Sequence, residues 1–118
     1  MSRYILEEPK DYSFEDRSGH SGKKFQTLTT HEGALIIECD DALTVSLREN
    51  ECDFSYYVIQ GSGYFVFNDG ERESVEAGNL VSIPAGTKFT FGGKLKMLLV
   101  NAPGYNPEQE ETFKRNDI

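Results

Sequence analysis

The sequence predicts a single all-β domain, built as an antiparallel sandwich or barrel. Short runs rich in Val, Ile, Thr, Tyr and Phe recur along most of the chain, and these residues suit a pleated, half-buried surface. Turn-forming residues separate the runs, as in proteins that are made of hairpins. The chain has 118 residues, of which 37% are hydrophobic, and this is the size of one domain around one core.

The expected strands show either alternation of apolar and polar residues or a compact apolar run. Alternation is clearest in residues 42–48, where Leu43, Val45 and Leu47 fall on one face and polar residues on the other. The eight expected strands are residues 24–30, 34–39, 42–48, 54–60, 64–68, 80–85, 88–91 and 95–101.

Two turns between these strands carry a strong sequence signal. Asp69-Gly70 predicts a hairpin, because both central residues of a type I′ turn need positive φ angles. Gly92-Gly93 is a second signal of this kind, between the last two expected strands. Turns of this type join antiparallel neighbours, so both signals favour an antiparallel sheet.

The chain divides into three segments. We expect a partly irregular N-terminal arm (residues 1–24), a barrel (residues 25–104) and a C-terminal tail (residues 105–118). The tail contains the one good helix signal, since Asn106 suits an N-cap and the following proline suits the first helical position. The sequence therefore predicts a short helix over Pro107–Lys114.

The composition argues against several classes of function. Twenty acidic residues against 12 basic ones give a net charge of -8, whereas binding to nucleic acid needs a basic surface. Cys39 and Cys52 are too few for a disulfide framework, and no Cys/His cluster suits structural zinc. The N-terminal residues lack the apolar run of a signal peptide, and no run is long enough to span a bilayer. We therefore expect a cytoplasmic protein that binds neither nucleic acid nor membrane.

Residues 42–93 resemble the cupin superfamily in two motifs. The segment GNLVSIPAGTKFTFGG supplies Gly78, Pro84 and Gly86 at the spacing of the second cupin motif. The segment SYYVIQG is similar to the tyrosine-rich end of the first motif, with Gly61 as its closing glycine. The resemblance implies a double-stranded β-helix (jelly-roll) barrel. It also implies a homodimer that forms through the outer strands.

The metal-ligand positions of both motifs are changed. The resembling family holds its metal with three histidines and a glutamate, residue types that suit such ions. Under the commoner motif spacing, Arg48, Asn50 and Phe89 occupy the histidine positions, and Phe54 occupies the glutamate position. Under the longer spacing, Leu47 and Glu49 take the place of Arg48 and Asn50. A guanidinium group is permanently charged and phenylalanine has no donor atom, so neither can bind a metal ion. We therefore expect no metal and no other cofactor in this barrel.

One alternative keeps a metal site open. Glu49, Glu51 and Asp53 alternate, so they would share one face of an extended strand. Three carboxylates facing the interior could hold a hard cation. The other interpretation is a solvated acidic face on the outside of the barrel.

A ligand site is expected inside the barrel, where Arg48 and Asn50 would supply polar contacts. A buried arginine needs a partner, which would be Glu38 or an anionic ligand. A packed barrel whose arginine reaches the rim is the alternative. The predicted ligand-binding residues are Arg48, Asn50, Phe54, Tyr56, Phe89 and Phe91.

These residues predict a metal-free barrel that binds a small polar or anionic metabolite. The alternative function is a metal-independent isomerase, epimerase, cyclase or lyase that acts on a sugar or a small carboxylic acid. A tyrosine, Glu38 or Cys39 would then act as base, because no histidine lies in the motifs. His20 and His31 are both expected as exposed surface side chains.

Overall fold

The fold is built from antiparallel strands alone in the part of the chain that the structure describes. The computed structural model describes residues 8–12, 20–28, 31–40, 45–68, 70–103 and 110–114. Within these ranges there is no helix, and hence none long and apolar enough to cross a membrane. The strands are β1 (Lys10–Tyr12), β2 (His20–Phe25), β3 (Gly33–Cys39), β4 (Val45–Glu49), β5 (Asp53–Phe67), β6 (Glu71–Glu76), β7 (Leu80–Ile83), β8 (Phe89–Ala102) and β9 (Glu110–Lys114).

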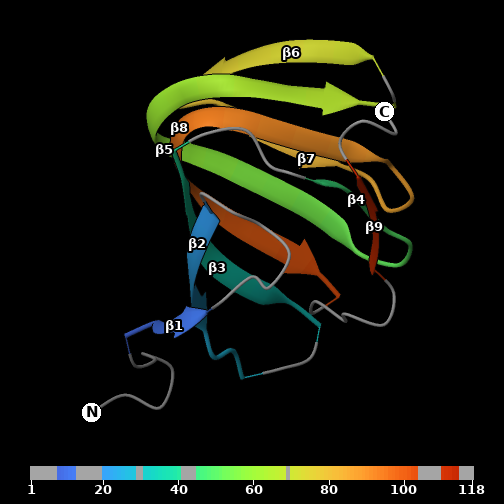
Figure 1. The fold of residues 1–118 in the computed structure, drawn as a ribbon. Coiled ribbons are helices and arrows are strands. Elements are labelled where there is room, and N and C mark those ends of the chain that lie inside the picture. Colours follow the sequence, from blue (N-terminus) through green and yellow to red (C-terminus); the bar gives the residue numbers. More distant parts are fainter. Residues whose placement is uncertain are drawn as a thin grey trace.

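The strands form two layers that share their two longest members (Figure 1). β5 and β8 pair along almost their whole length and cross from one layer to the other. In the first layer, the strand order is β2, β3, the second half of β8, the first half of β5, and β7. In the second layer, it is β4, the first half of β8, the second half of β5, and β6. This is the jelly-roll arrangement that the motifs implied.

Glycines allow β5 and β8 to bend between the layers. Gly61 and Gly93 have φ angles of 95° and 108°, which favour glycine. A Cβ atom at Gly61 would collide with the carbonyl oxygen of Lys94, and one at Gly93 would lie 2.6 Å from Cα of Gly63. The turn predicted at Gly92-Gly93 is therefore wrong: β8 runs through both glycines, which serve a bend and a close approach of two backbones.

The core lies between the two layers and follows the alternation of the strands. On β3 the buried side chains are Leu35, Ile37 and Cys39, at every second position. β8 contributes Leu95, Met97 and Leu99 in the same way. The predicted hairpin at Asp69-Gly70 is confirmed by the antiparallel pairing of β5 with β6 on either side of it.

The predicted C-terminal helix is wrong over the residues described. Glu110–Lys114 forms β9, which pairs with β4 from Glu49↔Glu110 to Val45↔Lys114. β4 pairs with β8 only at Leu47↔Phe89, so its other edge offers backbone groups that need hydrogen-bond partners. This non-local pairing outweighs a local capping signal. The proposed N-cap lies outside the described residues.

Candidate functional site

Five aromatic side chains fill the centre of the barrel around Tyr56. The Tyr56 ring lies 5.3 Å from Phe65, 5.5 Å from Phe91, 5.9 Å from Phe89 and 6.0 Å from Phe54, measured between ring centroids. All five side chains are 3% exposed or less. The structure thus brings together the four aromatic residues that the sequence singled out, in one buried cluster to which both layers contribute.

The two polar residues predicted for the same site lie elsewhere. Leu47 is buried and pairs with Phe89, so it takes the inward position of β4. Because strand residues alternate, Arg48 turns to the opposite face, where it is half-buried and its cross-strand neighbour is Glu111. Asn50 is exposed just beyond the end of β4. We expected the side chains of Arg48 and Asn50 to face the interior. In the structure the inward register of β4 is shifted by one residue from that expectation.

The acidic alternative does not assemble within the described residues. Glu51 and Asp53 are both exposed, and the Asp53 carboxylate accepts a hydrogen bond of 2.8 Å from the backbone N–H of Ala85. The side chain of Glu49 lies outside the described residues. Among the side chains that are described, no group of three His, Cys, Asp or Glu residues is placed to hold a metal ion.

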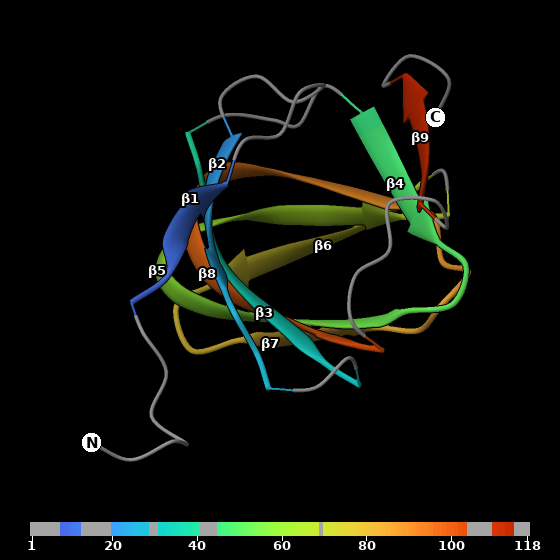
Figure 2. The ribbon, with the colours of Figure 1, turned by 90° about the horizontal axis from the view of Figure 1, so that it is seen from below.

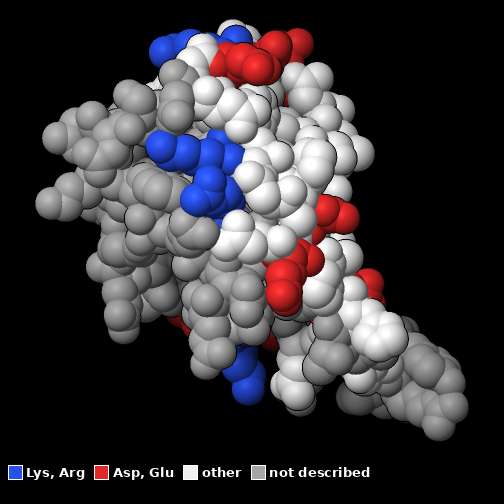
Figure 3. All heavy atoms as spheres, turned by 90° about the vertical axis from the view of Figure 1, so that its right-hand side faces the viewer, with Lys and Arg blue, Asp and Glu red and all other residues white. Residues whose placement is uncertain are grey.

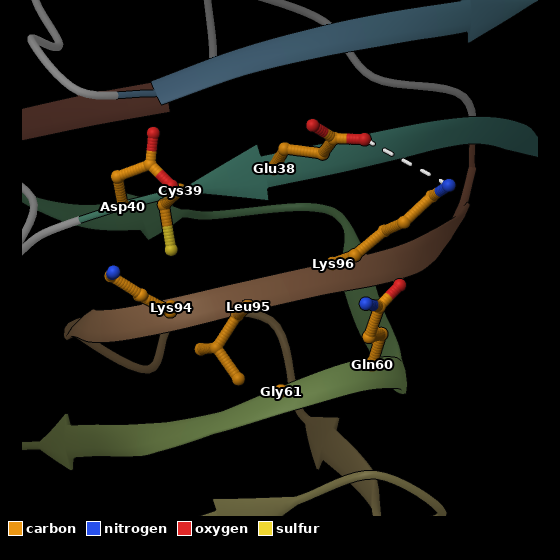
Figure 4. Close-up of a pocket in the computed structure, with 8 residues that line it drawn as sticks. All are labelled: Glu38, Cys39, Asp40, Gln60, Gly61, Lys94, Leu95 and Lys96. Carbon is orange, nitrogen blue, oxygen red and sulfur yellow. Dashed lines mark ion pairs between the residues drawn. The ribbon is translucent and has the colours of Figure 1, made fainter.

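Glu38, the predicted internal partner of Arg48, faces outward. Its carboxylate lies 3.8 Å from the ammonium group of Lys96, and the two side chains are 57% and 43% exposed. Figure 4 shows this ion pair at one end of a pocket of about 260 Å³ that also contains Asp40 and Lys94. Cys39 is buried next to Glu38, and its thiol donates to the carbonyl oxygen of Gly93 over 3.5 Å. Glu38 is thus unsuited to serve as an internal acid.

Sequence reasoning missed three polar residues of the interior: His20, and the fully buried Thr90 and Asn101. His20 pairs with Cys39, whose side chain faces the core, so both residues lie on the inner face of the first layer. The His20 ring lies 5.5 Å from the ring of Phe91, which belongs to the second layer, at an interplanar angle of 45°. Both ring nitrogens are shielded from solvent. The expected surface position is therefore wrong for His20, whereas His31 is exposed.

The inner face of β2 carries a second basic side chain. Gly22 and Lys24 pair with Ile37 and Leu35, which are buried, so both residues share the inward register of His20. Gly22 adds no side chain, and Lys24 is exposed at the outer end of the row. Along an extended strand, the Cα atoms of His20 and Lys24 are about 13 Å apart. Figure 2 shows β2 and β4 flanking one side of the sandwich.

The sequence pattern of β2 does not predict that this strand packs against the core. HSGKKF holds one apolar residue in six, so it lacks the alternation that predicts a half-buried strand. Its inward register follows only from its pairing with β3, which is apolar. The sequence offers one indication of this inward register. His20, Gly22 and Lys24 alternate with Ser21 and Lys23.

The charged side chains of the surface are mixed in sign. Figure 3 shows the right-hand face of Figure 1, where Lys and Arg gather in small groups beside separate groups of Asp and Glu. At the top of this view a basic and an acidic group adjoin each other, so the described part of this face carries both signs of charge. Two basic residues, His20 and Lys24, lie in the inward register of β2, although the chain as a whole has a net charge of -8.

Comparisons with known proteins identify the architecture. No protein-family model and no curated protein sequence matches this chain. Among solved structures, a variant of Streptomyces Pac13 with uridine superposes with a TM-score of 0.83 at 20% identity, covering 97% of this chain and 91% of that one. Pac13 is a nucleoside dehydratase.

Two further structures extend the likeness. Ectoine synthase from P. lautus superposes with a TM-score of 0.68 at 15% identity, covering 88% of this chain and 80% of that one. The cupin domain of Schizosaccharomyces pombe Cnp3 gives a TM-score of 0.64 at 10% identity, covering 73% of this chain and 66% of that one. At these identities the likeness concerns the fold. Together with the two-layered arrangement of the strands, it shows that this chain has the jelly-roll fold of these cupin structures.

Proposed function

We propose that the barrel binds a small polar metabolite between its two layers, on the side flanked by β2 and β4, without a metal ion. The observation that carries this proposal is the position of His20, which reaches across from one layer to Phe91 in the other. Small-molecule sites combine apolar walls with a few polar groups. Here the aromatic cluster around Tyr56 supplies the wall, and the inner face of β2 supplies His20 and Lys24.

The basic character of this face favours a ligand with hydroxyl groups or a negative charge. Imidazole and ammonium groups both donate hydrogen bonds, and Lys24 adds a positive charge at the outer end of the row. The likeness to Pac13 in complex with uridine supports a ligand of nucleoside size, and it makes uridine the natural first probe. In this proposal Lys24 provides the positive charge for the ligand, a role that the sequence analysis assigned to Arg48.

A second candidate function is a metal-independent lyase, and the position of His20 favours it. Elimination of water needs a base that removes a proton from carbon and an acid that protonates the departing hydroxyl as the double bond forms. Imidazole can do both, because its ordinary pKa is close to neutral pH. His20 suits this role better than Glu38, which is exposed and paired with Lys96. Pac13, with a similar fold, is a dehydratase.

Calorimetric titration with uridine tests the site, and the chain provides a matched control. His20→Gln should weaken binding of uridine by at least roughly tenfold, since a hydrogen bond to a charged or polar ligand is lost in a shielded place. His31→Gln changes the exposed histidine and should leave the affinity unchanged. Equal affinities for both variants would overturn the role of His20. Failure of uridine to bind the unaltered protein would overturn a nucleoside-sized ligand.

The metal-free part of the proposal needs its own measurement. Phe54 and Phe89 occupy ligand positions of the motifs inside the barrel and have no group that binds a metal ion. Elemental analysis of the purified protein should therefore find no stoichiometric metal, and uridine binding should survive treatment with a chelator. One metal ion per chain that is lost together with uridine binding would overturn the proposal.

We also propose that the chain forms a homodimer through the outer face of the first layer. Apolar side chains are exposed there on three neighbouring strands, with Leu80 on β7 beside Tyr57 on β5 and Val100 on β8. Burial of such a patch favours association. Light scattering after size exclusion should give the mass of two chains. Tyr57→Glu should give one chain, whereas Glu38→Gln, on the same outer face, should not. A monomeric unaltered protein would overturn the dimer.

A further inference from the structure

We propose a second binding site, independent of the β2 site, that takes an organic ammonium ion between β6 and β7. A pocket of about 420 Å³ opens there, and this is the size of many small-molecule sites. β6 and β7 are edge strands of the two layers, and the opposite edges are formed by β9 and β1. The lining residues that carry the argument are Phe65, Phe67, Glu73, Val75 and Val81.

The floor of this pocket is apolar and aromatic. Phe65 and Phe67 are stacked, with centroids 5.9 Å apart and an interplanar angle of 13°. Val75 on β6 is buried, and Val81 on β7 is partly buried against the core. Phe65 is fully buried, so Phe67, which is half-buried, presents the ring that a ligand can reach. Such a floor suits the apolar body of a small ligand, and the face of an aromatic ring attracts a cation.

The inner face of β6 places carboxylates next to these rings. Register pairs Glu73 with Phe65 and Glu71 with Phe67, so both glutamates lie on the face that turns toward the core. The core-facing side of an edge strand usually carries apolar residues, as β6 does at Val75. Glu73 is the one charged residue among the described side chains that line the pocket.

The nearest arginine on the strand does not neutralise this face. Arg72 lies between the two glutamates in sequence, so it turns to the other face of β6. Its guanidinium carbon lies 3.9 Å from the centroid of the Tyr64 ring, above the outer surface of the hairpin. The pocket side therefore keeps its negative charge, and an anionic ligand is repelled.

Aromatic rings and a carboxylate around a small pocket are the groups that recognise ammonium ions. We therefore assign the pocket to a ligand with a quaternary or primary ammonium head and a short apolar body. Inward-pointing charges on an edge strand also discourage pairing with another sheet. If the inward glutamates only prevented pairing with another sheet, the pocket would bind no ammonium ion. Titration with an ammonium ligand therefore distinguishes the two explanations.

Choline and its uncharged analogue 3,3-dimethylbutan-1-ol are the probes for this site. In ¹⁵N–¹H spectra of the whole chain, choline should shift amide signals of β6 and β7, and the alcohol should bind more weakly. Glu73→Gln should weaken choline binding by roughly fivefold, the effect of one partly exposed ion pair. It should leave the affinity for the alcohol unchanged.

Glu76→Gln is the matched control, because Glu76 is exposed on the outer face of the same strand and pairs with Ser62. This variant should bind choline as the unaltered protein does. Three results would each overturn the assignment: equal affinity for choline and the alcohol, equal effects of the two substitutions, or no shift at β6 and β7. None of these results affects the uridine titration. The proposal for the β2 site and the proposal for the pocket between β6 and β7 are therefore tested independently.

Discussion

His20 and Phe91 lie in different layers of the barrel, yet their ring centroids are only 5.5 Å apart. The contact joins a strand that looks polar in sequence to the aromatic centre of the molecule. It gives the interior an acid/base group, although the motifs supply no histidine. The packing and chemical roles of His20 can be separated by substitution.

His20→Phe should keep the packing against Phe91 and remove the titratable group. We expect a loss of about 1–2 kcal/mol in the free energy of unfolding, because the phenyl ring keeps the aromatic contact but is larger than imidazole. His20→Ala should lose the contact and cost more. Thermal unfolding of the two variants, together with uridine titration, measures both effects. A loss of stability in His20→Phe as large as in His20→Ala would show that the polar atoms, not the ring, hold this residue in place.

Tyr56 and Tyr57 are neighbours in sequence with opposite environments. Tyr56 is 2% exposed and contacts four aromatic rings, whereas Tyr57 is 45% exposed on the outer face. Tyr56→Ala should therefore cost about 3–5 kcal/mol of unfolding free energy. Tyr57→Ala should cost less than about 1 kcal/mol. Urea unfolding measures both, and similar losses would contradict the assignment of faces.

Gly61 tests the bend between the layers. Its φ angle of 95° and the nearby carbonyl oxygen of Lys94 exclude a side chain. Gly61→Ala should destabilise the fold by about 2–3 kcal/mol. Gly70→Ala is the control, because a Cβ atom there meets nothing within 4 Å. Urea midpoints for the two variants should differ clearly, and equal midpoints would count against a bend that depends on Gly61.

Asn101 is fully buried at the inner end of β8, and its amide makes no hydrogen bond within the described residues. Its carboxamide oxygen packs against Gly33, where a Cβ atom would collide with it. A buried polar group without a partner costs about 1–3 kcal/mol, so Asn101→Leu should raise the unfolding free energy by about 1 kcal/mol. Calorimetric melting measures this. A lower melting temperature would instead indicate that the amide is satisfied in solution.

Local sequence signals were sufficient for much of the fold and for the aromatic part of the site. The hairpin between β5 and β6 follows from its turn-forming residues, among which Asn68 has a φ angle of 48°. Phe89 follows from motif spacing, and Tyr56 lies in the tyrosine-rich motif strand. Arg48 was assigned to the wrong face because a slip of one residue reverses every face of a strand, and β4 pairs with β8 at only one described position, Leu47↔Phe89. The cytoplasmic location and the absence of nucleic-acid binding stay predictions.

The sequence by itself determined the all-β class, the cupin resemblance and the absence of histidine from residues 42–93, because these depend on local pattern and residue type. Only the tertiary structure decided the inward face of β4, the place of His20 beside Phe91, and the strand formed by Glu110–Lys114. These three features depend on which strands become neighbours and in which register. Pairing of that kind is non-local, so its energy is absent from any short stretch of the chain.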